Sequence, residues 1–404
     1  MNNLHAIACW IVTLTAFSLL TGCNSQTTRP TVMTTPEVVS QPIPEHLLLD
    51  AGIDLFDPGI EYLEEGKSTT TPSVRKAESV HTAHNVAKAL QSTGNWGSVR
   101  IVPGAQSETD VYVTGVIVKS DGESLNLKVT VTDSAGNTWY SRTYSDKLSQ
   151  YAYDRSLRED GQEPFQALYA EIARDMEQYA RRIEPSDREK LRLTSKMRFA
   201  QRFAPAEYND FMQVGTNGKY TLNRIPAEGD PVMAHLESIR VRDQMFVDRL
   251  QDYYAAFTAR LHTPYNQWRE ASYHETKAVR KLNSDATARK IGGALAVIAG
   301  ILVQASGNSS ARTAGVLGIG GGAYLFKSGL DRGSEVRIHE QGMKEMADSL
   351  GAEVEPLSVE LADKTVTLSG TVDEQYAQWR LILNDIYLAE VGQLPTQEYS
   401  DTDH

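Results

Sequence analysis

The sequence has almost no cysteine. Its two cysteines, Cys9 and Cys23, both lie within the first 23 residues, so no disulfide can join segments of the chain beyond that point. The folded part must therefore be stabilised by burial of apolar surface or by contacts between subunits. Basic side chains are also few, with 40 Lys and Arg against 52 Asp and Glu and a formal net charge of −12. This balance argues against nonspecific binding to nucleic acid or to anionic lipid, which needs dense Lys and Arg.

Common catalytic motifs are missing too. The sequence contains no G-x-S-x-G, H-E-x-x-H, Walker loop or zinc-type Cys/His pattern, which are signatures of hydrolases, metallopeptidases, nucleotide-binding proteins and zinc sites. A G-x-G-x-x-A pattern occurs at Gly318, Gly320 and Ala323, but residues 308–313 before it are polar, whereas a dinucleotide cradle needs a buried strand there. We therefore predict no catalytic residues and no bound cofactor.

The nine histidines are scattered along the chain. His81 and His84 lie three residues apart on one face of a predicted helix, where they are able to hold a metal ion together with an Asp or Glu. Ordinary surface histidines give the same spacing, and we favour that interpretation. Residues 401–404, Asp-Thr-Asp-His, are expected to form a frayed end rather than a chelator. We accordingly predict no metal site.

Charge is absent from the first 22 residues, which contain no Asp, Glu, Lys or Arg. Within them Ala6 to Leu20 form a largely apolar run, typical of a signal peptide and too short for a transmembrane helix, which needs about 20 apolar residues. The run ends at Leu20-Thr21-Gly22-Cys23, which resembles the lipobox of bacterial lipoproteins. An ordinary cleaved signal is the alternative, because residues 1–5 carry no Lys or Arg.

The lipobox resemblance implies a covalent anchor and a location. In that family the cysteine sulfur receives a diacylglycerol and the freed amine a further acyl chain, such as palmitate, and both would fall on Cys23. Several chains anchor a protein stably, because each buried methylene contributes about 0.8 kcal/mol. Asn24 replaces the Asp that retains enterobacterial lipoproteins in the inner membrane, so the resemblance implies the periplasmic face of the outer membrane. Residues 23–45 are rich in Ser, Thr, Gln and Pro and are expected to form a flexible tether.

Residues 46–183 carry the patterns of a small α/β module. An apolar run within Leu47–Tyr62 predicts a short strand, and Val74–Leu90 has the apolar spacing of a helix. Strands separated by glycine-containing turns are predicted over Trp96–Pro103, Asp110–Ser120, Leu125–Asp133 and Thr138–Tyr144. The two-residue alternation of Val111–Ile117 and Leu125–Val131 predicts that these two strands are antiparallel. A further helix is predicted over Glu163–Arg182. The order of helix, strand and meander from Val74 to Tyr144 resembles the amino-terminal module of TolB and the curli-secretion lipoprotein family. This resemblance implies a module that presents a sheet surface.

One long helix is predicted over Pro231–Asn283, within a helical region of residues 184–290. Its apolar positions alternate three- and four-residue steps, as in coiled coils and helix bundles; they include Leu236, Ile239, Phe246, Leu250, Tyr253 and Phe257. Thr263-Pro264 predict a kink or a break. The aromatic-rich stripe is accompanied by Arg240, Arg242, Arg249, Arg260 and Arg269. Core aromatics with solvated arginines opposite them is the interpretation that we favour over cation–π pairs or base stacking.

Residues 291–330 contain two charge-free, glycine-rich runs, Ile291–Ala305 and Ala314–Phe326. Small residues recur every four positions in both runs and so share one helical face; they are Gly292, Ala296 and Gly300, then Ala314, Gly318 and Gly322. This spacing resembles GxxxG helix pairs and glycine-zipper lipoproteins, and implies close helix packing. Each arm is roughly 20 Å long, short of the roughly 30 Å of bilayer hydrocarbon. A hairpin buried in the protein, one that joins subunits and one that enters a membrane remain open.

Residues 331–392 predict a helix, a β-hairpin and a second helix, followed by a disordered tail over residues 393–404. The predicted elements are a helix over Glu335–Leu350, strands over Leu357–Leu361 and Thr365–Val372, and a helix over Glu374–Glu390. The hairpin and last helix, joined by the sequence VTLSGTV, resemble the second half of a BON domain. The resemblance implies binding to phospholipid or to a periplasmic partner.

The predicted fold class is α+β, with the module, the long helix, the glycine hairpin and the C-terminal module in that order. This order and the lipobox resemble outer-membrane lipoproteins of Gram-negative bacteria. The anchor and the packing faces favour a lipid-anchored envelope scaffold or assembly factor, noncatalytic, that binds another envelope protein and self-associates through the long helix and the glycine segment. The alternatives are a membrane-associated oligomer resembling a curli-type secretion channel, and an envelope hydrolase whose carboxylates the sequence does not pair.

Overall fold

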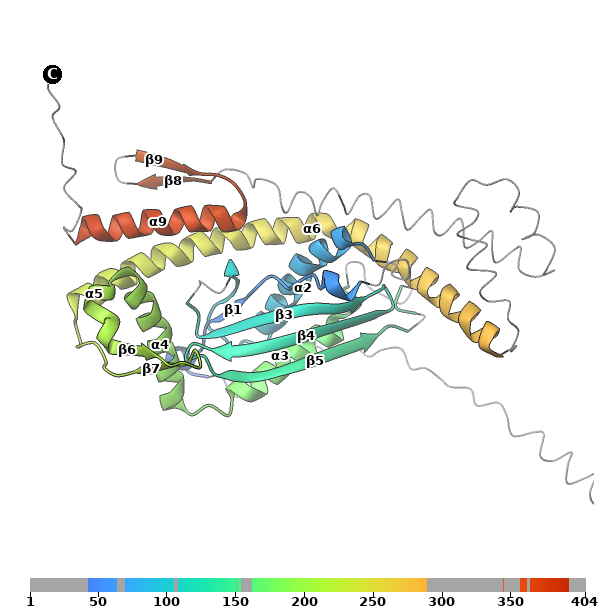
Figure 1. Cartoon of the computed structure of the whole chain (residues 1–404), viewed down its shortest axis with the longest axis horizontal. Coiled ribbons are helices and arrows are strands. Elements are labelled where there is room, and N and C mark those ends of the chain that lie inside the picture. The colour runs from blue at the N-terminus through green and yellow to red at the C-terminus, as the bar shows by residue number, and fades with distance from the viewer. Residues whose placement is uncertain are drawn as a thin grey trace, which may run out of the picture. The chain divides into compact units, whose positions relative to one another are not determined.

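The computed structural model describes residues 43–63, 70–104, 108–149, 151–153, 162–288, 344, 357–361 and 364–391. The described residues form a mixed sheet and several helices, which confirms the α+β class (Figure 1). The predicted lipidation residue and the predicted helix-packing positions lie outside these ranges; they are Cys23, Gly292, Ala296, Gly300, Ala314, Gly318 and Gly322. Within the ranges, every helix is either too short or too polar to cross a bilayer.

A five-stranded mixed sheet is the core of the α/β module. Its order is β2-β1-β3-β4-β5, with bounds β1 (Ala51–Ile53), β2 (Val99–Ile101), β3 (Val111–Ser120), β4 (Ser124–Asp133) and β5 (Thr138–Lys147). The three long strands form the antiparallel meander that their alternation predicts, with Val113 opposite Val131. β1 pairs in parallel with both β2 and β3. A helix connects β1 to β2, and such a crossover is what a parallel pair needs.

Two helices, α2 (Pro72–Ser92) and α3 (Gln166–Ala180), cover one face of this sheet. α2 begins where the Thr71 side chain accepts a hydrogen bond from Val74 N–H, with proline in its first turn. Both helices bury their apolar faces against the inward residues of the meander, which include Val113, Ile117, Leu127, Val129 and Val131. Figure 1 shows β3, β4 and β5 in front of these helices, so the other sheet face is not covered by them.

The segment between the module and the long helix holds elements that the sequence patterns did not delimit. They are α4 (Pro185–Phe203), α5 (Pro205–Tyr208), the 3-10 turn η4 (Asn209–Phe211), β6 (Met212–Val214) and β7 (Tyr220–Leu222). Two further 3-10 turns, η1 (Glu45–Leu47) and η2 (Ile60–Tyr62), lie earlier in the chain. Arg188 ties α4 to the start of the module, because its guanidinium donates a 3.2 Å hydrogen bond to the carbonyl of Leu47. α4 is thereby packed beside the sheet.

The long helix α6 spans Pro231–Ala288, 58 residues, and confirms the predicted helix. Pro264 lies inside it, so of the predicted kink or break at Thr263-Pro264 the break is wrong, and the kink stays a prediction. A proline in a helix interior costs about 3 kcal/mol. The neighbouring side chains of Leu261, Tyr265 and Trp268 are buried against the rest of the protein, and this packing holds the helix continuous.

The C-terminal part forms the predicted hairpin and helix, with β8 (Leu357–Leu361) antiparallel to β9 (Lys364–Leu368) and then α9 (Val372–Glu390). β9 ends before the predicted Val372 because Thr371 and Glu374 form a capping box that starts α9. α9 packs against the first half of α6 (Figure 1). The rings of Trp379 and Phe246 stack there, with centroids 5.5 Å apart.

Candidate functional site

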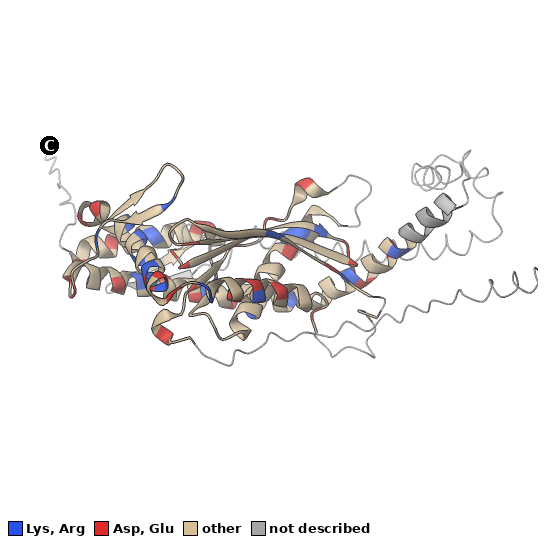
Figure 2. Ribbon diagram, turned by 90° about the horizontal axis from the view of Figure 1, so that it is seen from below, with Lys and Arg blue, Asp and Glu red and all other residues tan. Residues whose placement is uncertain are grey.

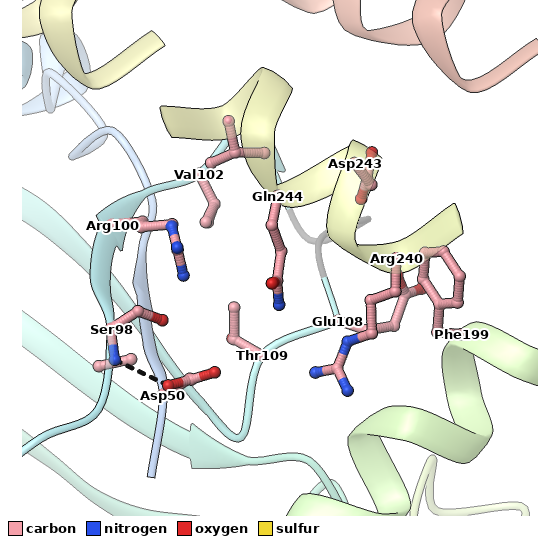
Figure 3. Close-up of a pocket in the computed structure, with 12 residues that line it drawn as sticks. Asp50, Ser98, Arg100, Val102, Glu108, Thr109, Phe199, Arg240, Asp243 and Gln244 are labelled. Atoms are coloured by element: carbon pink, nitrogen blue, oxygen red, sulfur yellow. Dashed lines mark hydrogen bonds between the residues drawn. The ribbon is translucent and has the colours of Figure 1, made fainter. Parts of the chain in front are cut away.

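A small cavity lies where β1, β2, the loop before β3, α4 and α6 meet (Figure 3). Its polar lining includes Asp50, Arg100, Glu108, Arg240, Asp243 and Gln244. The cavity leaves about 30 Å³ for the centres of water molecules, which is room for about two waters. Organic ligands occupy pockets on the order of 300 Å³ or more. The cavity therefore has room for water between charged side chains and not for an organic ligand. The contacts of those charged side chains are what characterise the site.

Arg240 of α6 joins one wall of the cavity to the sheet. Its Nη2 lies 3.5 Å from Ser195 Oγ of α4, and Ser195 Oγ donates to Asp110 Oδ1 at the start of β3. The other carboxylate oxygen of Asp110 accepts a 3.0 Å hydrogen bond from the backbone N–H of Asp50. Burial raises the pKa of Asp110, against the opposing effects of Ser195, the Asp50 N–H and Arg240. These contacts link α6, α4 and the sheet.

Glu108 is the centre of a second group of charges, which we call the Glu108 cluster: Glu108, Arg202, Asp243, Tyr376 and Arg380. The buried Glu108 carboxylate pairs with Arg202 of α4 and, at 3.6 Å, with Arg380 of α9. Arg380 Nη1 donates to Tyr376 Oη (3.0 Å), and Tyr376 Oη donates to Asp243 Oδ2 of α6 (3.2 Å). The cluster thus fastens α9 to α6, to α4 and to the loop before β3.

Asp243 is the titratable member of this cluster near neutral pH. Burial raises the pKa of its carboxyl to about 6; the negative charge of Glu108 adds to this, while Arg380, the hydrogen bond from Tyr376 and Arg202 oppose it. Asp243 Oδ1 is buried and has no hydrogen-bond partner among the described residues. The docking of α9 is therefore sensitive to the protonation of one side chain.

A third group, the Arg269 cluster, comprises Arg269, Glu163, His81 and Tyr265. Arg269 of α6 forms a bidentate ion pair with Glu163, which lies just before the start of α3, with N–O distances of 2.6 Å and 2.9 Å. His81 Nε2 of α2 lies 3.1 Å from Glu163 Oε2, and the guanidinium lies 4.2 Å from the ring centroid of Tyr265. Burial alone would raise the pKa of Glu163, but Arg269 and His81 outweigh it and hold that pKa well below its usual range.

Tyr265 extends the Arg269 cluster to a second buried carboxylate. Its Oη donates to Glu78 Oε1 of α2 at 2.7 Å, and Ser120 Oγ at the end of β3 donates to the same oxygen. Arg75 Nε lies 3.7 Å from Glu78 Oε2. The polar atoms on this face of α6 are thus directed to α2 and to the sheet.

The predicted surface position of the histidines is wrong for His81. His81 is buried in the Arg269 cluster, and its ring packs edge-on against Tyr265 at 4.8 Å. His84 is half-buried, and burial, His81 and Lys88 lower its pKa. Across the described ranges, no group of three His, Cys, Asp or Glu side chains is arranged to hold a metal ion.

The expectation that the α6 arginines are solvated is wrong for two of them. Arg240 and Arg269 are buried, whereas Arg249 and Arg260 are exposed. Arg240 follows Leu236, and Arg269 follows Tyr265, by four residues, which places both on the face of the apolar stripe. The exposed Arg249 and Arg260 follow Phe246 and Phe257 by three residues, so this spacing does not by itself identify the buried pair. The carboxylate partners of the buried pair follow from the fold and carry no signal in the sequence.

The two charged clusters fasten helix α6 to other parts of the fold. In the Arg269 cluster the Glu163 carboxylate is matched with the buried Arg269 guanidinium, and in the Glu108 cluster the buried Glu108 carboxylate is matched with the buried Arg380 and the exposed Arg202. A buried charge is retained only where it is paired and hydrogen-bonded. Both clusters join α6 to segments that are distant in the sequence, so they fix the position of this helix.

No known protein family and no curated protein matches this chain. A solved structure of a PelC variant dodecamer from Paraburkholderia phytofirmans is similar to 35% of this chain and 92% of its own chain, with 16% sequence identity and a TM-score of 0.21. At this TM-score the likeness defines neither the fold nor the function of the chain described here.

Proposed function

We propose that this protein is a noncatalytic, lipid-anchored scaffold or assembly factor of the bacterial cell envelope that works by binding another envelope protein. The observation that carries the proposal is α6, which has 58 residues and is therefore about 87 Å long at 1.5 Å per residue. The Arg269 cluster fastens one stretch of it to the α/β module, and the Glu108 cluster fastens another stretch through α9. A long helix held this firmly supports a role in keeping partners at a set distance.

The distribution of charge supports a protein partner. In the part of the chain that the structure describes, acidic and basic side chains are interspersed, and no extended basic stripe follows a helix or the sheet (Figure 2). Nucleic-acid binding would need such a stripe. The outward side of α6 also carries exposed apolar side chains at Val241 and Met245, which suit contact with a protein surface.

The anchor is tested at Cys23, the residue that the lipobox resemblance assigns to acylation. We expect metabolic labelling with palmitate to mark the wild-type chain and to leave Cys23→Ser unlabelled, and we expect Cys23→Ser to move from the membrane to the soluble fraction. Cys9→Ser is the matched control and should change neither result. Membrane retention of unlabelled Cys23→Ser protein would rule out the lipid anchor.

The contact function is tested with a photoreactive amino acid at Met245. We expect light to crosslink it to one defined envelope protein, whereas the same amino acid at Glu189, exposed on α4, gives no such product. Loss of the product in the Cys23→Ser background would tie the contact to the anchor. Release of soluble fragments from isolated cell wall by the purified protein would instead favour the hydrolase alternative and overturn the noncatalytic proposal.

A further inference from the structure

The two edge strands of the five-stranded sheet differ in whether another element covers them. β2 at one edge is covered by α6, where the carboxamide of Gln251 bonds both the N–H and the carbonyl of Ile101, each at 2.8 Å. β5 at the other edge is ten residues long and contains no proline. Long strands with a free edge are templates for pairing with another strand. Only the β5 edge offers that template within the described sheet.

The backbone groups that β5 turns away from β4 can be identified. Residues of an antiparallel strand alternate between facing the neighbouring strand and facing away. Leu148 N–H bonds the carbonyl of Glu123, in line with β4, so even-numbered residues face β4. Ser141, Thr143 and Ser145 therefore direct their N–H and carbonyl groups outward, and no backbone group elsewhere in the described ranges bonds them.

The side chains of β5 are complementary to a second copy of the same strand. Arg142 is 56% exposed and pairs with Asp175 of α3, and Asp146 is half-buried, with its Oδ1 accepting a hydrogen bond from the Lys147 N–H. If two β5 strands pair antiparallel about a two-fold axis at Tyr144, residue 142 of each lies opposite residue 146 of the other. Opposite charges directly across an antiparallel pair are favourable, and this register places the exposed guanidinium of Arg142, which also pairs with Asp175, opposite each Asp146.

We infer that two copies of this chain associate through β5, antiparallel and centred on Tyr144, to form one continuous ten-stranded sheet. Because α6 covers β2, head-to-tail joining of β2 to β5 is blocked, and the pairing closes as a two-fold dimer instead of growing into a fibre. The surface is distinct from the glycine segment. The inference stands independently of the proposed function, since a dimer would form whether or not the protein is a scaffold.

The test uses the full-length chain extracted in detergent, with its molar mass followed by light scattering across a dilution series. We expect a dimer whose dissociation constant rises at least tenfold in Thr143→Pro, which removes an outward N–H that β4 does not use. Thr143→Val keeps the N–H and should leave the dissociation constant unchanged. A chain that stays monomeric throughout, or an equally tight dimer in a folded Thr143→Pro variant, would overturn the inference.

Crosslinking keeps the inference testable if Thr143→Pro fails to fold. A mixture of Thr143→Cys and Ser145→Cys proteins should form a mixed disulfide on mild oxidation, because the proposed register places residue 143 of one copy opposite residue 145 of the other. A mixture of Asn126→Cys and Lys128→Cys, on the same face of β4, should not crosslink, nor should the wild type. Absence of the 143–145 product, or association abolished only by Gly318→Leu with Gly322→Leu, would assign the contact elsewhere and refute the β5 pairing.

Discussion

The carboxamide of Gln251 makes the two backbone hydrogen bonds with Ile101 that a neighbouring strand would otherwise make. Its Oε1 accepts the backbone N–H of Ile101 and its Nε2 donates to the backbone carbonyl of the same residue, both at 2.8 Å. One turn earlier on α6, Asp248 receives two hydrogen bonds from Arg100. A helix side chain thus satisfies the edge of the sheet that would otherwise be open.

Gln251→Leu should expose this edge. The change keeps the approximate size of the side chain but leaves the N–H and carbonyl of a buried residue, Ile101, without partners, and an unsatisfied buried group costs about 1–3 kcal/mol. We expect the midpoint of urea unfolding to fall accordingly. Asp252→Asn, one residue along and exposed, is the control and should unfold like the wild type. Equal midpoints for Gln251→Leu and the control would show that the edge does not depend on this side chain.

Arg269→Met should be among the most damaging single changes in α6. It removes the bidentate partner of Glu163 and leaves its carboxylate with only His81 and the backbone N–H of Phe165 as partners among the described residues. Breaking a buried ion pair on one side costs about 3–5 kcal/mol. Adding Glu163→Gln to Arg269→Met removes the uncompensated charge and should recover part of that loss in urea unfolding. Arg260→Met, at an exposed arginine of the same helix, should have little effect.

Elements with a strong local pattern could be predicted from the sequence. The alternation from Val111 to Val131 defines the meander, and the apolar spacing from Leu236 to Phe257 defines most of α6, because each pattern reports burial on one face. The C-terminal hairpin and α9 follow for the same reason. The parallel pairing of β1 could not be predicted, since a three-residue strand carries no period, and partner choice is set by the crossover through α2.

The candidate site was far less predictable than the fold. Glu108, Asp243 and Arg380 belong to three segments, and nothing near each of them in the sequence points to the others. Their proximity depends on α9 returning to pack on α6, which is a tertiary event. The two buried arginines lie on the apolar face of the predicted helix, and the sequence alone places them on that face. A surface location was nevertheless favoured, because arginine is rarely buried without a partner.

The stability of the protein should fall as the pH rises from about 4 to about 6 through Asp243. Its carboxyl has a pKa of about 6 in the fold against an ordinary value near 3.8, so the folded state binds the proton more tightly than the unfolded state within this window. At one pKa unit per 1.36 kcal/mol, the effect is on the order of 3 kcal/mol. Asp243→Asn should remove this component from the pH profile of urea unfolding.

The comparison with Asp243→Asn is needed because Glu163 acts in the opposite direction. Its pKa is held well below the ordinary value by Arg269 and His81 against the effect of burial. The stability that it contributes is therefore present above its unfolded pKa and is lost as the pH falls. Subtracting the Asp243→Asn profile from that of the wild type cancels the Glu163 contribution. A difference that does not change between pH 4 and pH 7 would show that Asp243 is not the titrating group.

Gly122→Ala should displace α6 from the β3–β4 turn. Gly122 has a φ of +77°, and a Cβ at this position would lie 2.4 Å from the carbonyl oxygen of Arg269 and 2.8 Å from the backbone N of Tyr273. Gly94→Ala is a matched control, because Gly94 has a similar φ of +67° and nothing within 4 Å of the added Cβ. Both changes carry the backbone strain of a left-handed residue, about 1 kcal/mol.

The two glycine variants differ in that only the Cβ at position 122 comes close to α6. The extra loss of stability in Gly122→Ala relative to Gly94→Ala therefore measures the cost of this close contact. Backbone atoms of a helix cannot move aside singly, and overpacking of this kind costs about 1–3 kcal/mol. We expect Gly122→Ala to unfold at a lower urea concentration than Gly94→Ala and to increase hydrogen exchange of the amides around Arg269. Equal unfolding midpoints for the two variants would mean that α6 does not rest on this turn, and the fastening role assigned to the Arg269 cluster would then lose its nearest structural support.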